Sequence, residues 1–308
     1  MSERVRHTDM SAGHDFESLE TAAKALERSG EYQVLRRLHY RPRYAEPTGA
    51  RVRSALVLDT ETTGLDPRND RIIELAFVRF TYEAETGRVL EVAAPVSYFE
   101  DPGRPIPANI TDLTGITDAM VKGTRIDDES VGASFVGADL IIAHHAGFDR
   151  PFVDQRLPFS RGKPWACSLA EVPWQPAGYA TAKLEYLLIK KCGIFFDGHR
   201  AADDCLALMH LLATPFEDDV TPLRHLLQSA RRKSARIWAL SSPFEVKDLL
   251  KARGYRWSSG EDGRPKAWWR EVFQEDREVE LDWLKENAYG GKAGPWRVDE
   301  VDAHTRYA

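Results

Sequence analysis

Between residues 53 and 214 the apolar positions predict an alternating α/β domain. Four runs are typical of strands: ALVLD from Ala55, RIIELAFVRFTYE from Arg71, GRVLEVAAPVSYF from Gly87 and ADLIIAH from Ala138. The first and last are continuous apolar runs, which indicates strands buried on both faces of a sheet. Thr86 and Gly87 form a bend between the second and third runs, so we expect the first three strands to form adjacent antiparallel pairs.

Helical patterns lie between and after these strands. ITDLTGITDAMV predicts short helical turns, and FDRPFVDQRL, AKLEYLLIKKCG and AADDCLALMHLLA predict longer helices, the second of them ending at Gly193. Strands and helices in this order favour a mixed sheet flanked by helices.

The flanking segments differ in character from this domain. Residues 15–29 have the spacing of an amphipathic helix, and residues 215–236 change from acidic PFEDDVTP to basic RRKSAR, which we interpret as a linker. The remainder reads helix, strand, turn, strand, helix, strand. We therefore expect an N-terminal helix and basic segment (1–52), an α/β domain (53–214), the linker (215–236) and a small α+β domain (237–308).

Composition narrows the class of protein. No apolar run is long enough to cross a membrane and the N-terminus has no apolar secretory signal, so we expect a cytoplasmic protein without a membrane partner. Cys167, Cys192 and Cys205 form no C-x-x-C pair, which argues against a disulfide framework or a zinc knuckle. The net charge of −6 argues against a basic nucleic-acid coat protein. An enzyme acting on nucleic acid remains compatible, because bound cations can offset a cluster of acids.

Candidate chemistry begins at the end of the first strand, in LVLDTETTGL. Asp59 and Glu61 are two residues apart, so in a strand they point to the same face and repel each other unless a cation joins them. Oxygen ligands favour Mg²⁺ or Mn²⁺ over Zn²⁺. Asp149 follows a buried strand, and His199 and Asp204 flank the start of a helix. Each of these three also has a structural reading, as a cap, a loop residue or a first-turn acid.

Three stretches together resemble the DEDD, or DnaQ-like, superfamily of 3′–5′ exonucleases, and the exonuclease domain of the DNA polymerase III epsilon type in particular. DTETTGL resembles the first motif, HHAGFD the second, and HRAADD has the H-x4-D spacing of the third motif of the histidine subgroup. LTGITDAMV resembles a stretch between the first two motifs. The resemblance implies a ribonuclease-H-like mixed five-stranded sheet flanked by helices. One departure is His145, where the family usually has asparagine.

The resemblance also implies roles for residues. Asp59 would bridge two Mg²⁺ or Mn²⁺ ions, Glu61 and Asp204 would support the ion that carries the attacking water, and Asp149 would support the other. His199 would be the general base, with Asp203 as a spare acid. The predicted substrate contacts are Thr62, Thr63, Gly64, Leu65, His144, His145 and Phe148.

The function expected from these residues is hydrolysis of phosphodiesters from the 3′ end of DNA, preferably single-stranded, to nucleoside 5′-monophosphates in repair or proofreading. The partners would be a nucleic-acid 3′ end and a replication or repair protein. An RNA exonuclease is the alternative within enzymes, because discrimination depends on contacts to the 2′-hydroxyl. A binding module on an inactive exonuclease fold is the alternative from another class. Alternation on KAWWREV also sends Trp268 and Trp269 to opposite faces, so that one of them could stack a base or bind a partner.

Overall fold

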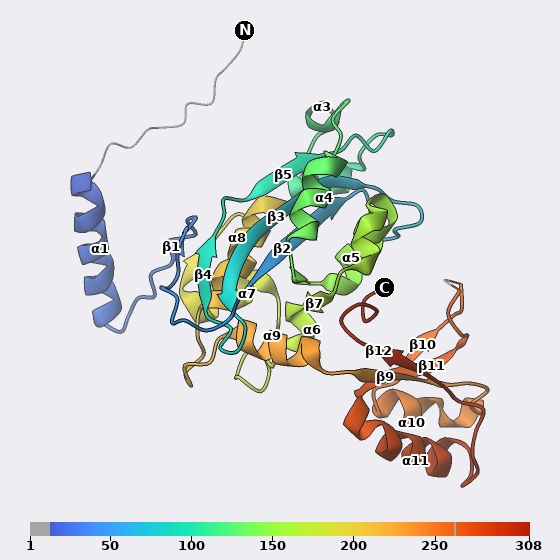
Figure 1. Cartoon of the computed structure of the whole chain (residues 1–308). Helices are drawn as coiled ribbons and strands as arrows, with labels where there is room; N and C mark the ends of the chain where they lie inside the picture. Colours follow the sequence, from blue (N-terminus) through green and yellow to red (C-terminus); the bar gives the residue numbers. More distant parts are fainter. Residues whose placement is uncertain (1–12, 262) are drawn as a thin grey trace.

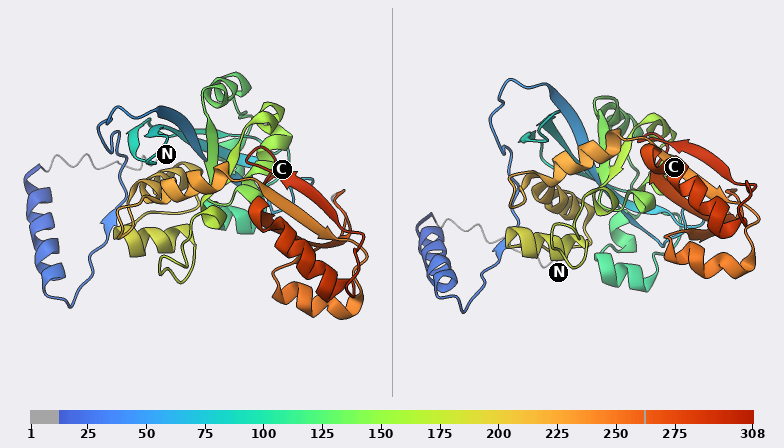
Figure 2. Two further views of the ribbon diagram at one scale, coloured as in Figure 1. Left: turned by 60° about the horizontal axis from the view of Figure 1, so that its bottom comes forward. Right: turned by 90° about the horizontal axis from the view of Figure 1, so that it is seen from below.

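The computed structural model describes residues 13–261 and 263–308, so residues 1–12 of the predicted N-terminal segment lie outside the described part. The N-terminal segment holds α1 (Gly13–Arg28) and β1 (Arg36–Arg37), which pairs in parallel with β8 (Ile194–Phe195). Within the described residues, no helix combines the length and apolarity that crossing a membrane requires. Helix α1 stands apart from the central sheet (Figures 1 and 2).

The central sheet has the strand order β4-β3-β2-β6-β7, and β5 also pairs with β3. Its strands are β2 (Val52–Thr62), β3 (Ile72–Glu83), β4 (Val89–Val92), β5 (Val96–Phe99), β6 (Leu140–Ala143) and β7 (Trp165–Cys167). Strands β2 and β3 are antiparallel, as predicted, whereas β6 and β7 run parallel to β2. The sheet is therefore mixed, and the predicted ribonuclease-H-like arrangement is confirmed. The strand predicted over 87–99 is split into β4 and β5 around Pro95, which has no N–H for a ladder.

Helices cover both faces of this sheet (Figure 1). One core includes α7 (Leu184–Leu187), α8 (Ala201–Ala213) and α9 (Pro222–Arg231), and the other includes α4 (Asp128–Val136) and α5 (Ala146–Arg156). The shorter elements are α2 (Ala108–Thr114), α3 (Asp118–Val121), η1 (Pro158–Gly162), α6 (Ser168–Glu171) and η2 (Leu188–Cys192). Val57 of β2 lies in the first core and Leu58 in the second. This alternation decides which helix each residue at the end of β2 meets.

The segment predicted as a linker is largely ordered structure that belongs to the domains on either side. Residues 222–231 form α9, whose Leu223 and Leu226 are fully buried in the core beneath α8. The hydroxyl of Thr221 caps this helix by accepting a hydrogen bond from the Arg224 N–H at 3.1 Å. The leucines of α9 face the core, whereas many of the other residues between 215 and 236 are charged. The charged residues therefore suggested a linker where the chain forms a packed helix.

The C-terminal domain has a four-stranded antiparallel sheet in the order β10-β11-β9-β12. Its elements are β9 (Ser234–Ala239), η3 (Phe244–Val246), α10 (Lys247–Ala252), β10 (Arg256–Ser258), β11 (Ala267–Phe273), η4 (Gln274–Asp276), α11 (Arg277–Ala288) and β12 (Arg297–Val301). Helices α10 and α11 pack on one face of the sheet (Figure 2). The predicted helices and strands are present, and β9, the strand between β11 and β12, was not predicted.

Arginines of the N-terminal basic segment are partly neutralised by acidic partners. Arg36 forms ion pairs with Glu20 at 2.9 Å and Glu27 at 3.0 Å, both on α1. Arg37 pairs with Asp197 at 2.9 Å. These ion pairs give Arg36 and Arg37 a structural role within the protein.

Candidate active site

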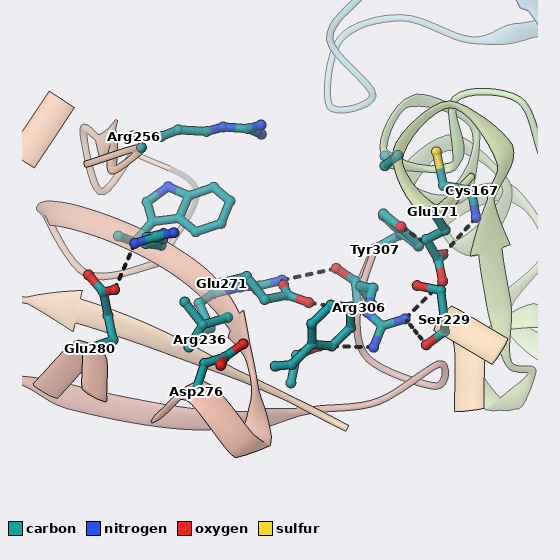
Figure 3. Close-up of a pocket in the computed structure, with 18 of the residues that line it drawn as sticks. Cys167, Glu171, Ser229, Arg236, Arg256, Glu271, Asp276, Glu280, Arg306 and Tyr307 are labelled. Atoms are coloured by element: carbon teal, nitrogen blue, oxygen red, sulfur yellow. Dashed lines mark hydrogen bonds and ion pairs between the residues drawn. The ribbon is translucent and has the colours of Figure 1, made fainter. Parts of the chain in front are cut away.

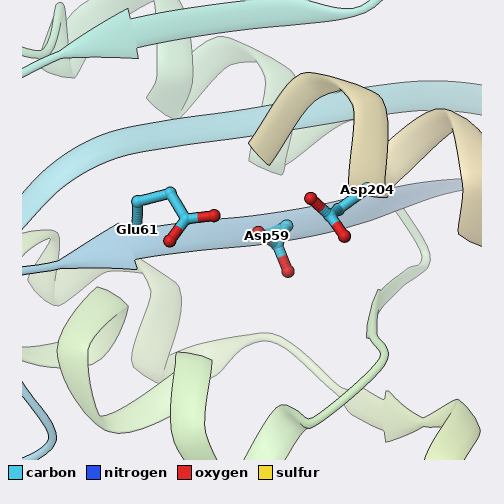
Figure 4. A group of neighbouring side chains, drawn as sticks. All are labelled: Asp59, Glu61 and Asp204. Atoms are coloured by element: carbon cyan, nitrogen blue, oxygen red, sulfur yellow. The ribbon is translucent and has the colours of Figure 1, made fainter. Parts of the chain in front are cut away.

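Two of the predicted carboxylates lie on the face of β2 that is covered by α8. Asp59 and Glu61 continue the odd-numbered row of Val57, and α8 brings Asp204 to them from above (Figure 4). One carboxylate oxygen from each of the three lies within 4.8 Å of the others. Residues that are 143 positions apart in the chain, from 61 to 204, are therefore brought together by the packing of one helix on one strand.

Asp149 reaches the same strand from the opposite side. Thr60 points toward the α5 face because its position in β2 is even, and its hydroxyl donates a hydrogen bond to Asp149 Oδ1 at 2.9 Å. The Thr60 backbone N–H donates to the same oxygen at 3.1 Å. Pairing of β2 with β6 ends at Val57, so this N–H lies beyond the ladder and the Asp149 carboxylate satisfies it.

The four carboxyl groups hold protons more tightly than free ones do. Burial, followed by the charges of Asp204, Glu74 and Asp149, raises the pKa of Glu61 to about 8. Burial raises the pKa of Asp149 to about 7 although the Thr60 hydrogen bonds lower it, and burial raises the pKa of Asp204 to about 6. The pKa of Asp59 lies well above its usual range because of burial and the charges of the other three. Four ionised carboxylates this close together repel one another, and the repulsion destabilises the fold unless cations or protons compensate the charge.

These residues fit a site for hard divalent cations. All the donor groups are carboxylate oxygens, which Mg²⁺ and Mn²⁺ prefer, and the cluster of Asp59, Glu61 and Asp204 is half-buried. Arg200, the N-cap residue of α8, forms its ion pair with another acid, Glu74, at 3.2 Å. A bound cation would therefore offset the repulsion that the protein itself leaves uncompensated.

The family of this domain follows from comparison with known proteins. Residues 56–161 match a family model described as Exonuclease. The domain is a DnaQ-like DEDD exonuclease domain. The match includes Asp59, Glu61 and Asp149 and ends before His199 and Asp204.

Relatives of the exonuclease domain include DNA polymerase III proteins. The chain is 34% identical over 168 residues to the DNA polymerase III PolC-type protein of Clostridium perfringens, covering 53% of this chain and 11% of that protein. It is 29% identical over 164 residues to the DNA polymerase III subunit epsilon of Treponema pallidum, covering 51% of this chain and 73% of that protein. A solved zinc-bound E. coli ExoI–ssDNA complex is similar with a TM-score of 0.48 and 16% identity, covering 76% of this chain and 71% of that one. The chain thus spans only a small part of the PolC-type protein.

The third motif of the exonuclease domain lies at the start of α8. Arg200 is the N-cap residue, and its N–H donates to Asp204 Oδ2 at 3.1 Å. Asp203 points outward and is exposed, whereas Asp204 faces β2. His199 is exposed and has a left-handed backbone with φ 65°, a conformation that non-glycine residues seldom adopt. This turn directs the chain into α8 immediately after the histidine.

The loop after Glu61 is fixed by its own side chains. The Thr62 hydroxyl donates to Gly64 O at 2.6 Å, and Arg104 donates to Thr63 Oγ1 at 2.8 Å. A Cβ on Gly64 would lie 2.4 Å from the carboxylate of Asp70, so the glycine is required by this internal contact whether or not a substrate approaches it. Leu65 is 84% exposed, which leaves it free to contact a ligand.

The predicted substrate contacts of the second motif divide into two kinds. The ring of His144 is used internally, because Nε2 donates to Ala182 O at 2.8 Å and Nδ1 accepts from the Ser168 hydroxyl at 2.7 Å. Burial lowers the pKa of His144 to about 4, so it stays neutral and links β6 to the segments beyond. His145, in contrast, is exposed and stacks on Phe148, with ring centroids 6.3 Å apart. Both ring nitrogens of His144 thus have partners within the protein, whereas His145 is exposed and Phe148 is half-buried, and the contact of these residues with substrate stays a prediction.

Glu74 is a further residue of the site, and sequence reasoning missed it. It lies opposite Glu61 in the β2–β3 ladder and is fully buried. Its carboxylate accepts hydrogen bonds from the Ser97 hydroxyl at 2.6 Å, from Arg200 Nε at 3.2 Å and from the Ala201 N–H at 3.3 Å. Glu74 thus fixes the first turn of α8. The signal in the sequence is an acid that interrupts the apolar run from Ile72 to Val78.

Proposed function

We propose that this protein is a metal-dependent 3′–5′ exonuclease of the histidine subgroup, which removes nucleoside 5′-monophosphates from the 3′ end of DNA and prefers single strands. The observation that carries the proposal is the convergence of Asp59, Glu61 and Asp204 within 4.8 Å inside an exonuclease domain. Divalent cations held there would supply charge compensation for a phosphodiester and a more acidic water.

The roles of the chain's own residues follow from their positions. Asp59, Glu61 and Asp204 would hold cations on the α8 face of β2, and Asp149 would act from the α5 face while Thr60 keeps its carboxylate oriented. His199 would accept the proton of the attacking water, since its exposed imidazole lies directly before the helix that carries Asp204. Leu65, His145 and Phe148 would contact the terminal nucleotides.

DNA is the proposed substrate because both polymerase relatives act in DNA synthesis according to their names. The ordered C-terminal domain favours a free-standing repair enzyme over a proofreading subunit, because it gives the exonuclease its own additional surface. A replication or repair protein is the proposed macromolecular partner.

The test is digestion of a 5′-labelled single-stranded DNA, with an RNA of the same sequence in parallel, in Mg²⁺, Mn²⁺ or EDTA. We expect a metal-dependent ladder that shortens from the 3′ end, is stronger on DNA, and is lost in Asp59→Ala. A ladder on RNA alone would replace the DNA assignment with the RNA alternative. A ladder that persists in Asp59→Ala would show that the assigned carboxylate is not required.

A further inference from the structure

A cleft of about 770 Å³ lies between the exonuclease domain and the C-terminal domain (Figure 3). His145 and Gly147, at the start of α5, form part of its exonuclease wall. Because an α-helix rises about 1.5 Å per residue, Asp149 follows only about 6 Å further along the same helix. Arg256 of β10 and Trp269 of β11 lie on the opposite wall. One wall of the cleft thus includes the start of the helix that carries Asp149.

The lining of the cleft carries more positive than negative charge. Glu280 is 3% exposed and is shared by Arg270 at 2.7 Å and Arg253 at 3.2 Å. Glu271 is likewise shared by two arginines. These two acids are therefore each paired with two cations. Among the described lining residues the cations are Arg236, Arg253, Arg256, Arg264, Arg270 and Arg306, and the acids are Glu171, Glu271, Asp276 and Glu280.

Trp269 provides a flat surface among these cations. Strand alternation sends Trp268 into the core of the C-terminal domain and Trp269 into the cleft. The guanidinium of Arg236 lies 5.2 Å from the Trp269 ring and that of Arg256 lies 5.8 Å from it. Arg256 is exposed and has no acidic partner among the residues that the structure describes. Trp238, with its ring centroid 5.9 Å away, supports the Trp269 ring from the sheet.

Residues 302–308, which follow β12, fix the exonuclease wall of the cleft relative to the wall formed by the C-terminal domain. The Trp165 N–H of β7 donates to Ala303 O at 2.7 Å. Arg306 donates to Glu171 at 3.0 Å and the Tyr307 hydroxyl donates to the same carboxylate at 2.8 Å. Since Glu171 belongs to the exonuclease domain, the cleft is formed before any ligand enters.

We propose that this cleft binds single-stranded nucleic acid upstream of the 3′ end, with a base stacked on Trp269 and phosphates on Arg256 and its neighbours. A half-buried aromatic ring that lines a cleft beside planar cations suits a chain that alternates flat bases and phosphates. A folded protein partner fits less well, because ten of the described lining residues are charged and the core of a protein–protein interface is depleted of charged residues. The inference rests on the proposed function, because one wall of the cleft includes the start of the helix that carries Asp149.

Binding is tested without catalysis, in EDTA, by fluorescence anisotropy with a labelled strand of about 20 nucleotides. Arg256→Ala and Trp269→Ala should each weaken binding about tenfold. Arg256→Ala should also reduce the slope of log affinity against log salt by about 0.7, the value for one lost phosphate contact on a single strand. Lys251→Ala and Trp257→Ala are matched controls, because both residues are exposed in the same domain and neither lines the cleft. The exposed position of Arg256 keeps the test decisive if Trp269→Ala fails to fold.

Activity adds a second readout in Mg²⁺. The ratio of kcat/KM on the long strand to kcat/KM on a trinucleotide should fall about tenfold in both cleft variants and stay unchanged in both controls. Equal binding by cleft and control variants would overturn the inference even if the exonuclease assay succeeds. Cleft-dependent binding by a wild-type protein that cleaves neither DNA nor RNA would support the inference and overturn the proposed exonuclease.

Discussion

Asp149 is joined to Thr60 by two hydrogen bonds, so the carboxylate of the second motif is oriented by the strand of the first motif. The backbone N–H would remain after any substitution of Thr60 except proline, whereas the hydroxyl can be removed. Thr60 is buried, and valine has nearly the same shape without the hydroxyl.

Thr60→Val should therefore weaken metal binding. A hydrogen bond to a charged group contributes about 1.5 kcal/mol or more, so the apparent affinity for Mn²⁺ should fall about tenfold. Isothermal titration with Mn²⁺ measures this, and Thr60→Ser, which keeps a hydroxyl, is the control. Equal affinities of the Val and Ser variants would mean that the hydroxyl does not orient Asp149.

Glu74→Gln should reduce both stability and turnover. The substitution leaves Arg200 without its buried ion-pair partner, and the first turn of α8 carries Asp204. Loss of hydrogen bonds to a buried charge costs about 1–3 kcal/mol, which urea unfolding measures. We expect turnover to fall about tenfold at saturating metal, because the third motif is displaced.

Ser97→Ala is the matched control for Glu74, because it removes one neutral donor to the same carboxylate and leaves Arg200 in place. It should lower the free energy of unfolding by about 1 kcal/mol with little effect on turnover. A Glu74→Gln variant that unfolds earlier yet cleaves at the wild-type rate would limit Glu74 to a role in folding.

The elements that carry the site were largely predictable because their signals are local. The apolar run before Asp59 indicated a buried strand, and the period of two placed Asp59 and Glu61 on one face, as observed. The bend at Gly87 predicted the antiparallel pairing of β3 with β4. Each inference depends on residues within a few positions of one another.

The interactions that were missed depend on distant partners. Glu74 acquires its role from Arg200, which is 126 residues away, and the internal role of His144 depends on Ala182, which is 38 residues away. Strand β9 overlaps the predicted linker only at residues 234–236, within the basic RRKSAR run, and it is stabilised by pairing with β11 and β12 on its two sides. Such contacts leave no periodic signal in a single sequence.

The raised pKa values predict how the metal-free protein responds to pH. Glu61 at about 8, Asp149 at about 7 and Asp204 at about 6 all lie above the values near 4 of unfolded carboxyl groups. The folded state therefore binds protons that the unfolded chain releases. The stability that these protons provide is fully present below about pH 4 and is lost as pH rises through these pKa values toward 8.

Thermal unfolding in EDTA should accordingly give a Tm that falls from pH 5.5 to 8.5. Added Mg²⁺ should raise Tm more at pH 8.5 than at pH 5.5, because protons no longer compete for the carboxylates. Asp59→Ala removes one repelling charge and should make the fall in EDTA shallower and the Mg²⁺ effect smaller. A Mg²⁺ effect that is larger at the lower pH would contradict the assigned ligands.

The left-handed backbone of His199 allows its side chain to be tested separately from its conformation. Alanine at φ 65° is strained, whereas asparagine tolerates this region and cannot act as a base at neutral pH. Both His199→Ala and His199→Asn should lower the single-turnover cleavage rate about a hundredfold, the lower part of the range for general-base catalysis, while Mn²⁺ affinity stays within about twofold. If His199→Asn cleaves at the wild-type rate and only His199→Ala is slow, the backbone turn and not the imidazole is what the reaction requires.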